Sequence, residues 1–115
     1  INRVQVLVNS RPAPEFNFTR ETHPQMFKDG VIKFDETLHI PLKEDAHLIV
    51  VAMHETMDLK TLYGTSSYNI MRPCAYNNPI YVDVDGKGFK ANGDTLGHDL
   101  PVAGMTPDKL KAKKQ

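Results

Sequence analysis

Hydrophobic and polar residues alternate along parts of the chain, a pattern typical of strands that bury one face. In residues 3–9 the valines at positions 4, 6 and 8 share one parity, and polar residues take most of the other. Residues 31–42 repeat this alternation over a longer span, interrupted only by Glu36. The sequence therefore predicts a strand in each stretch, the second with one solvent-exposed face and a bulge near Glu36.

Two more stretches predict strands that contribute to a core. Residues 46–54 are apolar on both parities and rich in β-branched side chains. That composition is typical of a strand in the middle of a sheet, covered on both faces. Ile80 and Val82 share one parity of a further alternating strand, which leads into a loop rich in aspartate and glycine.

A short strand is also predicted between the first two patterned stretches. Phe16 and Phe18 flank a polar residue and indicate a strand that pairs back on residues 3–9. Pro12 and Pro14 precede it, and prolines have no N–H group to contribute to a ladder. We therefore expect turn structure, rather than strand, around these two prolines.

The remaining segments are connections. Residues 55–77 form the least regular part of the chain, and either a short helix within 56–62 or a loop held against another domain would explain them. Thr106 followed by Pro107 has the pattern of a helix start. Five or six short strands with little helix predict an all-β fold, an antiparallel immunoglobulin-like β-sandwich over residues 1–104 that lacks an N-terminal strand, followed by a basic tail at 105–115.

The composition of the chain argues against several classes of function. The chain has 115 residues, enough for one domain, and 14 basic residues balance 14 acidic ones. This balance gives no net field that would favour nucleic acid or an acidic membrane. No apolar run approaches the roughly 20 residues of a membrane-spanning helix. Cys74 is the single cysteine, and the start at Ile1 without a methionine indicates a piece of a longer chain.

The loop after the last strand is the one place where the sequence predicts a ligand. Asp83 and Asp85 lie two residues apart, and Asp94 follows at the twelfth position of a calcium-loop pattern whose seventh residue, Phe89, would offer its carbonyl oxygen. These four residues are the predicted Ca²⁺ ligands. Lys87 departs from the pattern, because it stands at a ligand position and cannot coordinate a cation. The alternative is a hairpin turn at Asp85 and the following glycine, with the aspartates accepting main-chain hydrogen bonds.

No catalytic constellation is evident. His54 and Glu55 begin a zinc-protease-like pattern, but its second histidine is replaced by Asp58. The other histidines are scattered, and neither a nucleophile elbow nor a phosphate-binding loop is present. We therefore predict no catalytic residues in this chain.

Three segments resemble the C-terminal region of bacterial, planctomycete-type PHP-domain metallohydrolases of the CehA/McbA-like group. They are RVQVLVNSRP near the start, DAHLIVVA at 45–52 and NPIYVDVDG at 78–86. The resemblance extends from Arg3 to Val102. In that family the metal-binding His and Asp motifs belong to a separate catalytic barrel, and none of them can be matched here. Relatives often carry Asp or Asn at the position of Lys87, which would complete the calcium loop.

The resemblance implies an accessory role. The chain would be a non-catalytic β-sandwich that packs against the catalytic domain of the same parent protein or shapes access to it. Export signals are common in the family, which implies a periplasmic or secreted location. The alternative is a self-standing module that binds carbohydrate or a protein partner through residues 63–76, since loops on a rigid sandwich commonly carry binding.

Overall fold

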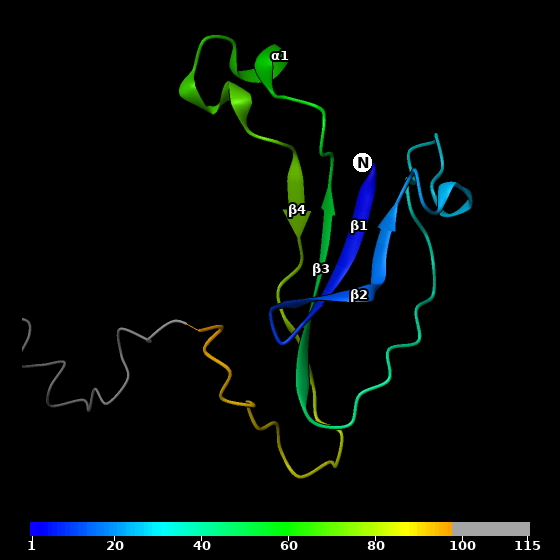
Figure 1. Ribbon diagram of the computed structural model, residues 1–115, viewed down its shortest axis with the longest axis vertical. Coiled ribbons are helices and arrows are strands. Elements are labelled where there is room, and N and C mark those ends of the chain that lie inside the picture. The colour runs from blue at the N-terminus through cyan, green and yellow to red at the C-terminus, as the bar shows by residue number, and fades with distance from the viewer. Residues whose placement is uncertain (98–115) are drawn as a thin grey trace, which may run out of the picture.

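The computed structural model describes residues 1–97 and contains one antiparallel sheet (Figure 1). Its strand order is β2-β1-β3-β4, and β5 also pairs with β3. The strands are β1 (Arg3–Val8), β2 (Arg11–Thr19), β3 (Ala46–Met53), β4 (Cys74–Tyr76) and β5 (Ile80–Val82). The all-β class is therefore confirmed, with the described residues in one open sheet. The predicted domain end at 104, the basic tail and the helix start at Thr106 lie outside the described residues.

β3 is the central strand, as its largely apolar sequence predicted, but it is not covered on both faces, because Val50 is 38% exposed. Along one edge it pairs with the whole length of β1, from Val8 opposite Leu48 to Arg3 opposite Met53. Along the other edge β5 pairs with its first residues and β4 with its last. Asn77 bridges the two, because its side-chain oxygen accepts a 2.6 Å hydrogen bond from the Val50 N–H. β4 and β5 thus act as one interrupted edge strand.

A tight turn joins β1 to β2. Asn9 and Ser10 both have positive φ, 51° and 65°, as the type I′ turn of a two-residue hairpin loop requires. The Asn9 side chain accepts a 3.0 Å hydrogen bond from the His47 N–H, and the Asn9 N–H donates to the His47 carbonyl at 2.9 Å. The turn is therefore attached to the start of β3.

The expected break at the two prolines is wrong. β2 begins at Arg11, and Pro12 pairs with Leu7. β2 lies at the edge of the sheet, where a proline can point its missing donor away from the ladder. The register shifts between Gln5 and Leu7, so the chain bulges beyond Pro12 before the pairing resumes at Asn17.

The predicted strand over residues 31–42 is also wrong. This stretch forms only an isolated bridge, between Phe27 and Phe34, and is otherwise irregular. Its apolar side chains are used differently: Phe34 and Leu38 pack on the cluster of buried residues Val4, Phe18 and Phe27. Of the predicted buried face, Phe34 and Leu38 are half-buried and cover the sheet instead of extending it, whereas Ile32 is 62% exposed. A short 3₁₀ turn, η1 (Pro24–Met26), precedes it.

Residues 54–73 form an arm beyond the end of β3, at the top of Figure 1. The arm contains a single helical turn, α1 (Lys60–Tyr63), and a 3₁₀ turn, η2 (Ser67–Ile70), which contact each other. The expected short helix is therefore present, at the end of the predicted range. No buried residue lies in either turn. Among residues 1–97 no helix has the length and apolar character to cross a membrane.

Candidate metal centre

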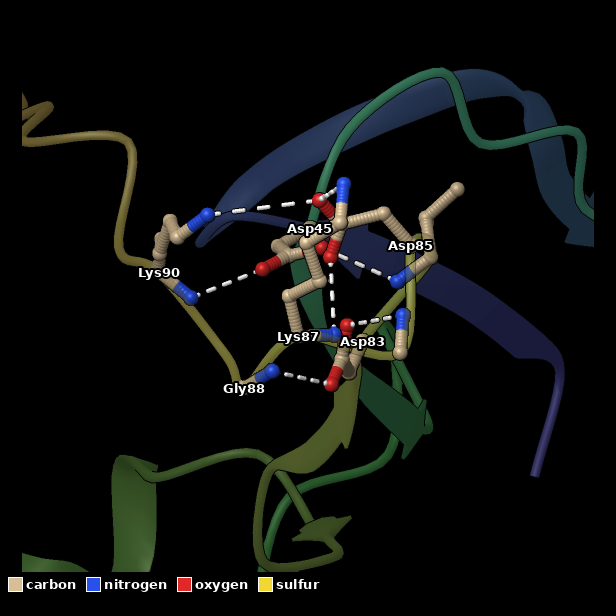
Figure 2. A network of polar contacts seen from close by, with 8 residues as sticks. Asp45, Asp83, Asp85, Lys87, Gly88 and Lys90 are labelled. Atoms are coloured by element: carbon tan, nitrogen blue, oxygen red, sulfur yellow. Dashed lines mark hydrogen bonds and ion pairs between the residues drawn. The ribbon is translucent and has the colours of Figure 1, made fainter.

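Three carboxylates meet at the end of the sheet where β3 begins, opposite the arm that follows the end of β3 (Figure 2). Antiparallel pairing sets Ala46, the first residue of β3, opposite Val82, the last residue of β5. Asp45 and Asp83 flank this pair and so lie side by side, and Asp85 joins them from the loop. One oxygen of each carboxylate lies within 4.8 Å of the others. We call Asp45, Asp83 and Asp85 the acidic cluster.

Asp83 organises the loop that follows β5. Its two oxygens accept hydrogen bonds from the N–H groups of Gly86, at 2.8 Å, and Gly88, at 2.7 Å (Figure 2). Both glycines have positive φ, 71° and 97°, which other residues adopt at a cost. The side chain therefore holds the chain in a turn that the two glycines make accessible.

Asp45 fastens the same loop to the start of β3. Its oxygens accept from the N–H groups of Val84, at 2.9 Å, and Lys90, at 2.7 Å. These main-chain hydrogen bonds, and secondarily the Lys90 charge, lower the pKa of Asp45 below its usual value. Asp45 is thus ionised at neutral pH and joins segments far apart in the sequence.

Two lysines lie at the cluster. The Lys87 ammonium is 3.4 Å from Asp85 Oδ2 and donates to it, and the Lys90 ammonium is 4.0 Å from the same oxygen. The Lys87 N–H also donates to Asp85 Oδ1 at 3.0 Å. Both ammonium groups are largely exposed, so they partly neutralise the cluster while remaining free to move into solvent.

Asp94, a further predicted ligand, is bound elsewhere. Asp94 forms a two-pronged ion pair with Arg11, at 2.5 Å from Nε and 2.8 Å from Nη2, and accepts the Leu96 N–H. The hydrogen bonds from Arg11, and then that from Leu96, lower the pKa of Asp94 from 3.8 to about 2. The pair therefore stabilises the fold above the ordinary pKa, and this contribution is lost as the pH falls towards 2. The Phe89 ring packs on Tyr81.

The sequence pattern missed Asp45, which lies 38 positions before Asp83 and belongs to no loop motif. Only the β3–β5 register brings the two together. In the sequence, Asp45 comes directly before one predicted strand and Asp83 directly after another. That the two carboxylates lie close together can be inferred only when those strands are known to be antiparallel neighbours.

The acidic cluster has the chemistry of a hard-cation site. Calcium binds carboxylate and carbonyl oxygens, and a carboxylate has about four acceptor positions, so main-chain hydrogen bonds leave part of that capacity free. The histidines with resolved hydrogen bonds do not join it: His23 contacts Thr22, His47 contacts Ser10, and His54 accepts from the Met57 N–H.

Comparison of the chain with protein-family models, curated proteins and solved structures gives no match.

Proposed function

We propose that the chain is a non-catalytic accessory domain that packs against the catalytic domain of a larger, PHP-type metal-dependent hydrolase. One observation carries the docking part of this proposal. Among residues 1–97, fifteen large hydrophobic residues are exposed, whereas seven hydrophobic residues are buried. Scattered exposed hydrophobics are ordinary, but contiguous ones mark surfaces that another protein segment covers.

The arm supplies one such surface. Six large apolar residues are exposed there, and they are Met57, Leu62, Tyr63, Tyr68, Ile70 and Met71. Between positions 59 and 71 the only charged residue is Lys60. The two turns of the arm bury no residue and so form no core of their own. We therefore propose that a partner surface covers the exposed apolar side chains of the arm.

The open sheet face supplies the second surface. Val6, Val50 and Ile80 share one face, as the pairing of Val6 with Val50 and of Leu48 with Ile80 requires. Over β1 and β2 this face is covered by the 27–38 segment, and Val6 is fully buried. Around Val50 and Ile80 it is open, with Val50 38% and Ile80 52% exposed, whereas Ala46 and Ala52 on the same face of β3 are covered. We propose that a second layer from outside residues 1–97 completes an immunoglobulin-like sandwich here.

The resemblance at 45–52 and 78–86 supports the PHP-type parent, and the missing catalytic pattern supports the accessory role. An assay of the isolated chain against phosphodiester and ester substrates, with Mn²⁺, Zn²⁺ or Ca²⁺ added, is expected to show only background turnover. Metal-dependent turnover that survives repurification would contradict the proposal. The parent protein, assayed beside it, serves as the positive control.

A structural calcium ion at the acidic cluster is the second part of the proposal, with Asp45 in the place that Asp94 took in the sequence pattern. A site filled at 100 times its Kd stabilises the fold by about 2.7 kcal/mol, which raises the Tm of a domain of this size by several degrees. We expect this difference between melts in EDTA and in millimolar Ca²⁺.

Two variants test that assignment. Asp83→Ala should abolish the calcium-dependent rise in Tm, and Asp94→Ala should retain it, because Asp94 is bound to Arg11. If the melts of the unsubstituted chain in EDTA and in Ca²⁺ superimpose, the calcium site is contradicted, and the aspartates serve only to form the turn. A loss of the shift in Asp94→Ala, with Asp83→Ala unaffected, would contradict the ligand set.

The exposed tyrosines favour a second candidate, a self-standing binding module. Tyr63 and Tyr68 on the arm and Tyr76 on β4 all present more than half of their surface to solvent. Tyrosine is enriched at interfaces because it combines an apolar ring with a polar tip. The encoding gene separates the candidates: an upstream frame with clustered His-x-His motifs supports the accessory domain, and a short frame with its own signal peptide supports the module.

A further inference from the structure

A cavity of about 390 Å³ lies beside β5 and next to the acidic cluster's pocket, with which it shares the lining residues Ala91 and Asn92. Its lining includes His47, Tyr81 and Phe89 together with Asn92, Asp94 and Thr95. The volume falls in the range of small-molecule sites, about 300–1,000 Å³. The cavity therefore combines an aromatic side with a polar one.

The aromatic side rests on the sheet. Tyr81 lies opposite His47 in the β3–β5 register, and their ring centroids are 6.2 Å apart. The Phe89 ring meets Tyr81 edge-on at 4.9 Å. Tyr81 is 63% and Phe89 36% exposed, and neither belongs to the buried cluster around Phe18. The two rings thus form an aromatic surface that core packing does not explain.

On the polar side the charged lining residue is Asp94, whose ion-pair partner Arg11 is not among the residues that line the cavity. Asp94 is paired with Arg11 through two hydrogen bonds and accepts a third from Leu96. A carboxylate has about four acceptor positions and a guanidinium five donors, so the pair retains both an acceptor and donors. Asn92 and Thr95 add neutral polar groups. A ligand that matches this side is uncharged and offers neighbouring groups that both donate and accept.

We propose that this cavity binds a neutral pyranose sugar. The apolar C–H face of a pyranose complements the electron-rich face of an aromatic ring. Its hydroxyls can donate to Asp94 and accept from the Asn92 amide, both of which line the cavity. A phosphate ester fits less well, because Asp94 brings a carboxylate to the cavity wall and Arg11, which pairs with it, is not among the lining residues. This site differs from the arm tyrosines and does not depend on the accessory role.

The test uses the 115-residue chain with cellobiose, mannobiose and galactobiose as probes, observed by saturation-transfer NMR and titrated calorimetrically at millimolar concentration. We expect at least one disaccharide to bind. Tyr81→Ala should then weaken binding by about tenfold or more, because it removes the most exposed ring of the cavity. Arg11→Gln should weaken binding as well, because it breaks the ion pair that holds Asp94 in place at the cavity.

Ile80→Ala is the control, since Ile80 is exposed on the same strand, β5, but does not line this cavity. It should bind as the unsubstituted chain does. Tyr81→Phe, which keeps the ring, protects the test against misfolding of Tyr81→Ala and should retain binding. Failure of all three disaccharides to bind, or equal weakening by Ile80→Ala and Tyr81→Ala, would overturn the proposal.

Discussion

Phe18→Ala is expected to lower the free energy of unfolding by about 3–5 kcal/mol, the usual cost of deleting a buried phenyl ring. Phe18 is 8% exposed and belongs to the buried cluster with Val4 and Phe27. Its ring centroid lies 5.8 Å from that of Phe34, so it also anchors the segment that covers the sheet. Domains are typically stable by only about 5–15 kcal/mol, and this one buries few side chains. The variant should therefore be largely unfolded at moderate temperature.

Urea denaturation followed by far-UV circular dichroism measures this effect. Phe89→Ala is the matched control: it removes the same ring from a position that is 36% exposed and outside the buried cluster. We expect a cost of under about 1.5 kcal/mol there, because only part of the ring is removed from water. Equal losses in the two variants would show that the cluster around Phe18 is not the core.

Asn9→Ala is expected to cost about 2–4 kcal/mol through two effects. Alanine at a φ of 51° is strained, whereas asparagine tolerates that region. The substitution also leaves the partly buried His47 N–H without its acceptor, which costs about 1–3 kcal/mol. Because this hydrogen bond ties the β1–β2 turn to β3, the loss should also loosen the β1–β2 hairpin.

Asn9→Gly separates the two effects. Glycine adopts positive φ without strain but cannot accept the His47 hydrogen bond. Its loss of stability, measured by the same denaturation, should lie between those of the unsubstituted chain and Asn9→Ala. A glycine variant as unstable as Asn9→Ala would assign the whole effect to the hydrogen bond. Full stability in both variants would contradict the role of this turn.

The sequence predicted the strands that have a clear pattern of apolar residues and whose flanking residues mark where they end. Residues 3–9, 46–54 and 80–82 were identified within a residue or two. The segment 31–42 was not, because alternation records only that one side of an extended chain is buried. Whether that side belongs to a sheet depends on hydrogen-bond partners far away in the sequence. Here the segment packs on Phe18 and Phe27 without a ladder.

The same limit explains which residues of the candidate site could be predicted from the sequence. Asp83 and Asp85 were predicted because they belong to one short loop. Asp45 was missed and Asp94 misplaced for one physical reason: both are positioned by tertiary pairing, Asp45 by the β3–β5 register and Asp94 by Arg11 at the start of β2. A linear motif contains neither relation.

Hydrogen exchange tests the central claim, that the apolar arm and the open sheet face are covered by another part of a larger protein. The protein encoded by the whole reading frame would be compared with the isolated 115-residue chain, by mass spectrometry of peptides from residues 54–73 and 74–82. We predict exchange slower by about tenfold or more in the larger protein at both segments, with β1 little changed, since docking adds protection where hydrogen bonds were exposed. Equal exchange in the two proteins, or a reading frame without a further domain, would contradict it.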